Sequence, residues 1–155
     1  MKKYFYGEYL NTLDEKGRIA FPAKLREILG GEVIWITKGM DNDRSLMIYS
    51  PEEWDKLLQD LDGKINIYNR DSRWLYRKFI APAREVVIDK NGRIAIPHSL
   101  REYANLKKDC VFLGMNKVIE LWDVDTFNDE DSKASENGIN SFEELGRLSK
   151  QPSMN

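Results

Sequence analysis

TLDEKGRIAFPAKLRE, at Thr12–Glu27, returns almost unchanged later in the chain as VIDKNGRIAIPHSLRE, at Val87–Glu102. The two stretches align with a constant offset of 75 residues, and nine of their 16 aligned positions are identical. The identical pairs are Asp14/Asp89, Gly17/Gly92, Arg18/Arg93, Ile19/Ile94, Ala20/Ala95, Pro22/Pro97, Leu25/Leu100, Arg26/Arg101 and Glu27/Glu102. A repeat this long that occurs twice is typical of a duplicated half-domain, not of a solenoid or a propeller. The sequence therefore predicts two pseudo-symmetric halves that share one core.

Each copy of the repeat has the pattern of a strand, a tight loop, a second strand and a short helix. β-Branched and apolar residues flank Asp-Glu-Lys-Gly in the first copy and Asp-Lys-Asn-Gly in the second. An aspartate at the first turn position accepts local backbone N–H bonds, and a glycine at the fourth takes positive φ, so each loop is predicted to close a β-hairpin through a type I turn with a bulge. Pro22 and Pro97 then end the second strand and fit the start of a helix, because proline has no N–H to donate.

Two further apolar strands follow each short helix, at residues 33–37 and 45–50 in the first copy and at 110–114 and 117–122 in the second. Each copy is therefore predicted to be β-β-α-β-β, and the fold class α+β and mostly β. The predicted divisions are a first half-domain at 6–54, a helical connector at 55–83, a second half-domain at 84–127 and an acidic tail at 128–155.

Helices are predicted in the connector and after the second half. Ser50–Leu58 and Asp123–Glu130 each begin with a residue suited to an N-cap and contain an aromatic side chain. Asn69–Ile80 has apolar residues at helical spacing. From Asn128 onward the sequence is rich in charged and small polar residues, so we expect partial disorder there, apart from a weak helical pattern at Ser141–Leu148.

Composition excludes several classes of protein. No apolar run reaches the roughly 18 residues that a membrane span needs, and the start has no signal-peptide pattern. We therefore expect a cytoplasmic protein without a membrane partner. Cys110 is the one cysteine of the chain, so no internal disulfide can form, and its apolar neighbours predict a buried thiol.

The formal net charge of −2 argues against a uniformly basic nucleic-acid binder. The charge is unevenly distributed, however. Residues 128–155 carry six acidic and three basic side chains, which leaves residues 1–127 with a net charge of +1. Between Lys64 and Arg101, nine Lys and Arg residues face three acidic ones. Any basic surface is therefore expected to be local.

Sequence motifs of common enzymes are absent from the chain. It has no phosphate-binding Gly-x-x-x-x-Gly-Lys loop, no Gly-x-Gly-x-x-Gly, no His-Glu-x-x-His and no nucleophile elbow. His98 is the single histidine, which excludes a histidine-rich metal site within one chain. Asp14 and Asp89 each lie in a turn beside an arginine that keeps them ionised, so they are poor general acids. We expect no enzymatic activity, no small-molecule substrate, no metal and no cofactor.

The repeated Asp-x-x-x-Arg loops are the candidate functional site. A two-stranded ribbon is slim enough to enter a DNA groove. On this hypothesis Arg18 and Arg93 contact phosphates or guanine edges, Asp14 and Asp89 orient the guanidinium groups, and Lys16 and Lys90 add mobile donors. The alternative is an oligomeric protein-interaction scaffold, without specific DNA binding, whose arginines only close the loops against the aspartates.

Three segments of the chain carry a family resemblance. YGEYLNTLDEKGRIAFPAKLRE at Tyr6–Glu27, VVIDKNGRIAIPHSLREYANL at Val86–Leu106 and IELWD at Ile119–Asp123 resemble the MraZ family of bacterial transcriptional regulators. The resemblance runs from about Tyr6 to Phe127. Asn91 and the acidic tail are places where the sequence departs from the usual pattern.

The resemblance implies a tandem pair of AbrB-like swapped-hairpin half-domains, in a double-psi-type barrel, within one chain. It also implies a ring-shaped homo-oligomer, associated with the nucleoid, that binds repeated double-stranded DNA elements upstream of the cell-division and cell-wall gene cluster containing its own gene, as an autoregulatory repressor. The DNA-contacting motif of the family falls on Asp14 and Arg18, and again on Asp89 and Arg93.

Overall fold

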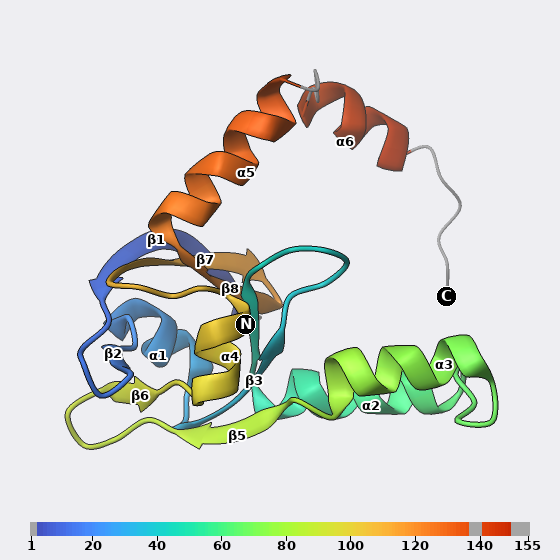
Figure 1. Ribbon diagram of the computed structural model, residues 1–155, viewed down its shortest axis with the longest axis horizontal. Coiled ribbons are helices and arrows are strands. Elements are labelled where there is room, and N and C mark those ends of the chain that lie inside the picture. Colours follow the sequence, from blue (N-terminus) through green and yellow to red (C-terminus); the bar gives the residue numbers. More distant parts are fainter. Residues whose placement is uncertain (1–2, 137–140, 150–155) are drawn as a thin grey trace. The chain divides into compact units, whose positions relative to one another are not determined.

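The computed structural model describes residues 3–136 and 141–149 (Figure 1). The first copy forms β1 (Phe5–Thr12), β2 (Arg18–Ala20), α1 (Ala23–Leu29), β3 (Val33–Lys38) and β4 (Leu46–Tyr49). The connector forms α2 (Pro51–Asp62), α3 (Arg70–Leu75) and a π-helical turn, η1 (Tyr76–Ile80). The second copy forms β5 (Arg84–Val87), β6 (Arg93–Ala95), α4 (His98–Tyr103), β7 (Asp109–Asn116) and β8 (Val118–Asp123), followed by α5 (Val124–Glu136) and α6 (Ser141–Ser149). The predicted β-β-α-β-β order is confirmed in both copies, and the fold is α+β.

The strands that flank the repeated loops pair with the other copy. A six-stranded antiparallel sheet has the order β1-β7-β8-β4-β3-β5, and β2 pairs with β6 in a separate two-stranded ribbon. In the described residues β1 therefore pairs with β7 rather than β2, and β5 with β3 rather than β6. The prediction of a simple hairpin at each loop is wrong in this respect, because pairing across the copies allows each half to cover the apolar face of the other.

An approximate two-fold axis relates the two copies. In the β2–β6 ribbon Ile19 lies opposite its own repeat equivalent, Ile94. The flanking pairs are Arg18 with Ala95 and Ala20 with Arg93, so exchanging the copies leaves the register unchanged. The same exchange preserves the register of β4 against β8, where Leu46 faces Leu121 and Ile48 faces Ile119. The duplication in sequence thus corresponds to a pseudo-symmetric structure.

The repeated apolar positions form one shared core. Both members of the equivalent pairs Leu13/Ile88, Ile19/Ile94, Phe21/Ile96 and Leu25/Leu100 are buried in a single cluster. Phe21 packs edge-to-face on Phe112, with ring centroids 5.8 Å apart. Truncation of fully buried side chains such as these to alanine typically costs about 2 to 5 kcal/mol of stability, so the core fixes the frame that carries the loops.

A second apolar cluster joins the connector to the sheet. Trp54 of α2 stacks on Trp35 of β3 with ring centroids 5.4 Å apart, and Phe79 packs against both Trp54 and Tyr49. The helix predicted at 69–80 is an α-helix as far as Leu75 and then widens to a π-helical turn. The buried hydroxyl of Thr37 donates to the carbonyl of Phe79 at 2.5 Å, and Ala81 N–H reaches back to the carbonyl of Tyr76. These bonds explain why the turn differs from a regular helix.

The described residues from Asp125 onward form a compact unit distinct from that of residues 3–124. Residues 128–136 continue α5, whose start was predicted at 123–130, and 141–149 form α6 where a helical pattern was predicted. The partial disorder expected from Asn128 stays a prediction. Charged side chains one turn apart support both helices, with Lys133 3.7 Å from Glu130 and Arg147 2.7 Å from Glu144. The rest of the predicted tail lies outside the described residues. No helix in 3–136 or 141–149 has the length and apolar character to cross a membrane.

Candidate nucleic-acid interface

The first repeated loop is held closed by the carboxylate of Asp14. Its Oδ1 accepts hydrogen bonds from the backbone N–H of Lys16 at 2.9 Å and of Arg18 at 2.8 Å. Its Oδ2 accepts one from Arg18 Nε at 2.9 Å. Gly17 takes a φ of +80°, which closes the turn as the sequence predicts. One carboxylate thus shapes the backbone and orients a guanidinium.

The second loop has the same backbone but a looser ion pair. Asp89 Oδ1 accepts from the N–H groups of Asn91 at 2.8 Å and Arg93 at 3.0 Å, and Gly92 has a φ of +77°. Arg93 Nε, however, lies 3.8 Å from Asp89 Oδ2 and has no hydrogen-bond partner among the described residues although it is buried. The second arginine is therefore held less firmly by its own aspartate than the first.

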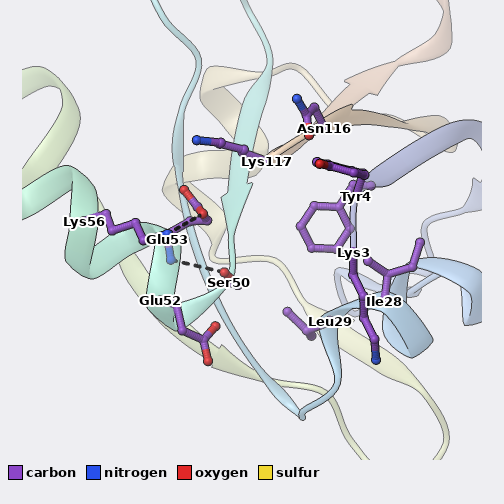
Figure 2. Close-up of a pocket in the computed structure, with 11 residues that line it drawn as sticks. Lys3, Tyr4, Ile28, Leu29, Ser50, Glu52, Glu53, Lys56, Asn116 and Lys117 are labelled. Atoms are coloured by element: carbon purple, nitrogen blue, oxygen red, sulfur yellow. Dashed lines mark hydrogen bonds and ion pairs between the residues drawn. The ribbon is translucent and has the colours of Figure 1, made fainter. Parts of the chain in front are cut away.

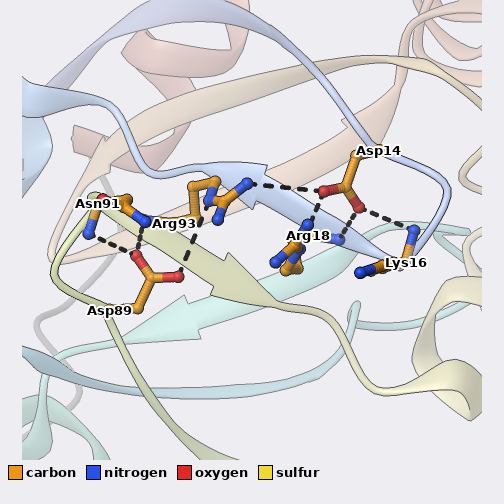
Figure 3. Close-up of polar contacts among 6 residues, drawn as sticks. All are labelled: Asp14, Lys16, Arg18, Asp89, Asn91 and Arg93. Atoms are coloured by element: carbon orange, nitrogen blue, oxygen red, sulfur yellow. Dashed lines mark hydrogen bonds and ion pairs between the residues drawn. The ribbon is translucent and has the colours of Figure 1, made fainter.

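The two loops meet across the two-fold axis (Figure 3). Arg93 Nη1 lies 3.8 Å from Asp14 Oδ2, so Asp14 faces an arginine from each copy. Cross-strand pairing places Arg18 and Arg93 on the same face of the β2–β6 ribbon, while Ile19 between them points into the core. The four motif residues therefore form one partly exposed cluster with side chains 31 to 42% accessible, which we call the Asp-Arg cluster (Asp14, Arg18, Asp89, Arg93).

Local hydrogen bonds keep both aspartates of the cluster ionised. The backbone N–H of Arg18, followed by its side chain and the N–H of Lys16, lowers the pKa of Asp14 below its ordinary value of 3.8. The N–H of Arg93, followed by that of Asn91 and the charges of both arginines, lowers the pKa of Asp89 in the same way. The lowered pKa values of Asp14 and Asp89 agree with the prediction that both carboxylates are poor general acids.

The two remaining predicted site residues are Lys16 and Lys90. They lie in the same loops as the cluster and have exposed side chains at the loop tips. Arg26 and Arg101, the last-turn basic residues of α1 and α4, were not among the predicted site residues. Each lies against the loop of the other copy: Arg101 against Gly17 and Arg26 near Gly92. Their identity in the repeat was the available signal.

A hollow of about 270 Å³ lies between the start of β1, the end of α1, the start of α2 and the β7–β8 turn (Figure 2). Its Ser50 hydroxyl caps α2 by accepting from Glu53 N–H at 3.2 Å, and Glu53 lies 3.4 Å from Lys56. Neither His98 nor Cys110 lines it. Cys110 is buried, which raises the pKa of its thiol to about 12. In residues 3–136 and 141–149 no cluster of His, Cys, Asp and Glu could hold a metal ion.

A family model described as "MraZ protein, putative antitoxin-like" matches residues 4–78 and again residues 79–147. The chain belongs to the MraZ family. It is 43% identical to the transcriptional regulator MraZ of Treponema denticola over 142 residues, and this alignment covers 92% of this chain and 97% of the relative. It is 41% identical to that of Alkaliphilus metalliredigens, over 92% of this chain and 99% of the relative. The protein of Acetivibrio thermocellus is 47% identical over 77% of this chain and 80% of its own length.

Membership in the MraZ family bears on two expectations. The relatives in Treponema denticola and Alkaliphilus metalliredigens are named transcriptional regulators, which supports the expectation of a regulator. The resemblance was expected to end near Phe127, but the second match continues to residue 147. This limit was wrong, since the acidic segment that contains α5 and most of α6 belongs to the MraZ pattern.

Proposed function

We propose that this MraZ protein is a sequence-specific DNA-binding regulator that reads repeated upstream elements through its Asp-Arg cluster. In this role it acts in the cytoplasm, at the nucleoid, as an autoregulatory repressor of the cell-division and cell-wall gene cluster containing its own gene. Lys16 and Lys90 contribute phosphate contacts, and Asp14 and Asp89 orient the two arginines.

The observation that carries the proposal is the shared face of the β2–β6 ribbon. Arg18 and Arg93 project from this face, and each has an alanine as its cross-strand partner, Ala95 and Ala20 respectively. Both alanines are exposed, so no bulky side chain stands beside the guanidinium groups on the ribbon. A two-stranded ribbon that presents paired arginines fits the dimensions and hydrogen-bonding groups of a DNA major groove.

We also propose that several copies assemble into a closed ring, because one Asp-Arg cluster on a chain of net charge −2 attracts DNA weakly. Support comes from exposed apolar side chains on the sheet. Tyr6 of β1 lies directly opposite Met115 of β7, and they are 62% and 47% exposed. Leu10 of β1 is 73% exposed, whereas its repeat equivalent in β5 is the charged Glu85. Exposed apolar patches of this kind mark association surfaces.

The alternative function, a protein-interaction scaffold, is favoured by one observation. Arg18 is already engaged by Asp14 through a 2.9 Å hydrogen bond, as a purely loop-closing role requires. Both functions include this pairing, since an arginine that recognises DNA also needs an orienting partner. They differ in what happens when the arginine is removed.

A gel shift with a duplex carrying the upstream DNA of the gene itself, over a series of salt concentrations, tests the proposal. Arg18→Ala and Arg93→Ala should each weaken binding by about 5- to 150-fold, because a bidentate base contact contributes about 1 to 3 kcal/mol. The melting temperature should change little, since partly exposed ion pairs contribute about 1 kcal/mol or less. A shuffled duplex is the control for specificity.

Lys16→Ala and Lys90→Ala are the matched control variants. They should lower affinity evenly for the specific and shuffled duplexes, as expected for phosphate contacts. A double Arg18→Ala, Arg93→Ala protein that remains folded, assembled and fully able to bind the specific duplex would refute the proposal in favour of the scaffold.

A further inference from the structure

Arg101 packs flat against the first loop although it belongs to the second copy. An added Cβ on Gly17 would lie 2.5, 2.7 and 2.8 Å from the Cζ, Nη1 and Nε atoms of Arg101. These nearly equal distances mean that the face of the guanidinium covers the glycine. Arg101 Nε donates to the carbonyl of Ile96 at 3.0 Å, which fixes the group in place. The guanidinium therefore lies in a defined position against Gly17, the residue that precedes Arg18.

Arg26, the repeat equivalent of Arg101, is placed differently. Its Nη2 forms an ion pair with Glu32 Oε1 at 2.7 Å. Its contact with the other loop is looser, since an added Cβ on Gly92 would lie 3.4 Å from Arg26 Nη1. The positive charge of Arg26 is thus compensated inside the molecule, while Arg101 forms no ion pair within the part of the chain that the structure describes.

A single repeat position accounts for the difference. Ile88 N–H donates to the carbonyl of Glu32 at 2.7 Å, and its equivalent Leu13 N–H donates to the carbonyl of Lys108 at 2.8 Å. Lys108 therefore occupies, in the second copy, the backbone position that Glu32 occupies in the first. Arg26 pairs with the carboxylate of Glu32, whereas the equivalent position in the second copy is the exposed Lys108. The surroundings of the two arginines differ by two units of charge at this position.

We propose that Arg101 is a further DNA-contacting residue, which binds a backbone phosphate beside the first loop. Arg26 does not bind one, because Glu32 engages its terminal Nη2, whereas Asp14 engages Arg18 through Nε. This inference rests on the proposed function, since it assigns a partner to the same surface. It makes the two halves of the pseudo-symmetric site unequal. A fixed, uncompensated guanidinium next to a DNA-reading loop is well suited to bidentate contact with phosphate.

Fluorescence anisotropy of the full chain with a specific and a shuffled duplex, from 0.1 to 1 M salt, tests this inference. The salt slope is the steepness with which the logarithm of affinity falls with the logarithm of salt concentration, and loss of one phosphate contact lowers it by about 0.9. Such a loss weakens binding about eightfold at 0.1 M salt and hardly at all near 1 M salt. Arg101→Gln should produce this change with both duplexes. Arg26→Gln, the matched control, should change affinity less than about twofold, and Glu32→Gln should raise it by freeing Arg26.

Arg101→Lys separates charge from folding, because it also loses the Nε bond to Ile96 but keeps a cation. It should retain most of the affinity that Arg101→Gln loses. The inference is overturned if Arg101→Gln binds like the wild type, if Arg26→Gln costs as much, or if the lysine and glutamine variants lose affinity equally. A wild-type protein that binds both duplexes alike would instead refute sequence-specific recognition, and the Arg101 and Arg26 variants would still test the phosphate contact.

Discussion

Replacement of Gly17 by alanine tests the packing of Arg101 against the first loop, with Gly92→Ala as an internal control. The two glycines have nearly equal φ angles, +80° and +77°, so the backbone strain of an alanine should be about the same at both, roughly 1 to 2 kcal/mol. Only at Gly17 would the new methyl group collide with a guanidinium, at 2.5 Å. Arg101 must then move and lose its hydrogen bond to Ile96, which contributes about 1 kcal/mol.

We therefore expect Gly17→Ala to lower the free energy of unfolding by about 2 to 3 kcal/mol and Gly92→Ala by about 1 to 2 kcal/mol. Urea unfolding followed by tryptophan fluorescence, at one fixed protein concentration because assembly adds to apparent stability, measures both values. In an Arg101→Ala background the excess cost of Gly17→Ala should disappear, since nothing remains for the methyl group to displace. Equal costs at the two glycines, or an excess that persists without Arg101, would refute the packing.

Three further properties follow from the structure. The pKa of Asp14 is lower in the folded protein than its unfolded value of 3.8, so the carboxylate stabilises the fold at pH values above 3.8 and loses this effect as the pH falls through the folded pKa. Asp14→Asn should therefore reduce the urea midpoint of unfolding at pH 7 and make that midpoint fall less steeply in acid. An unchanged midpoint at pH 7 would contradict this. If the proposed ring forms through the exposed sheet face, Leu10→Glu should lower the mass measured by light scattering, whereas Tyr68→Glu, at a residue 84% exposed in the connector, should not; an unchanged mass for Leu10→Glu would contradict this surface. Cys110, whose burial raises its pKa to about 12, should react with a thiol reagent at pH 8 only after unfolding, and rapid labelling of the native chain would disprove its burial.

Local features of the fold were accessible from the sequence because their causes lie within a few residues. An aspartate three positions before a glycine is sufficient for the loop geometry of Asp14–Gly17, and the structure has the expected bonds and positive φ. Ser50 was expected to cap a helix and accepts from Glu53 N–H. The start of α5 was likewise predicted from its N-cap residues, but the sequence did not show how far the helix extends, and Lys133 pairs with Glu130 beyond the predicted segment.

The candidate site could be predicted from the sequence in part. The repeat identified Asp14, Arg18, Asp89 and Arg93, but it suggested two separate loops. Their union in one cluster, with Arg93 3.8 Å from Asp14, depends on the antiparallel pairing of β2 with β6. The difference between Arg26 and Arg101 was only partly visible, because the alignment at an offset of 75 sets a lysine, Lys107, opposite Glu32 but shows neither the ion pair of Glu32 with Arg26 nor the packing of Arg101 on Gly17.

The sequence by itself determined the duplication, the order of helices and strands, and the turn chemistry of both loops, since periodicity and turn propensity act over short spans. Only the tertiary structure decided which strands pair, because a strand's apolar face can be buried by either copy and burial has no directional preference. In the folded chain β1 pairs with β7 and β5 pairs with β3, and the strands of each pair lie far apart in the sequence. That exchange brings Arg101 of the second copy over Gly17 of the first, and Arg26 of the first copy near Gly92 of the second.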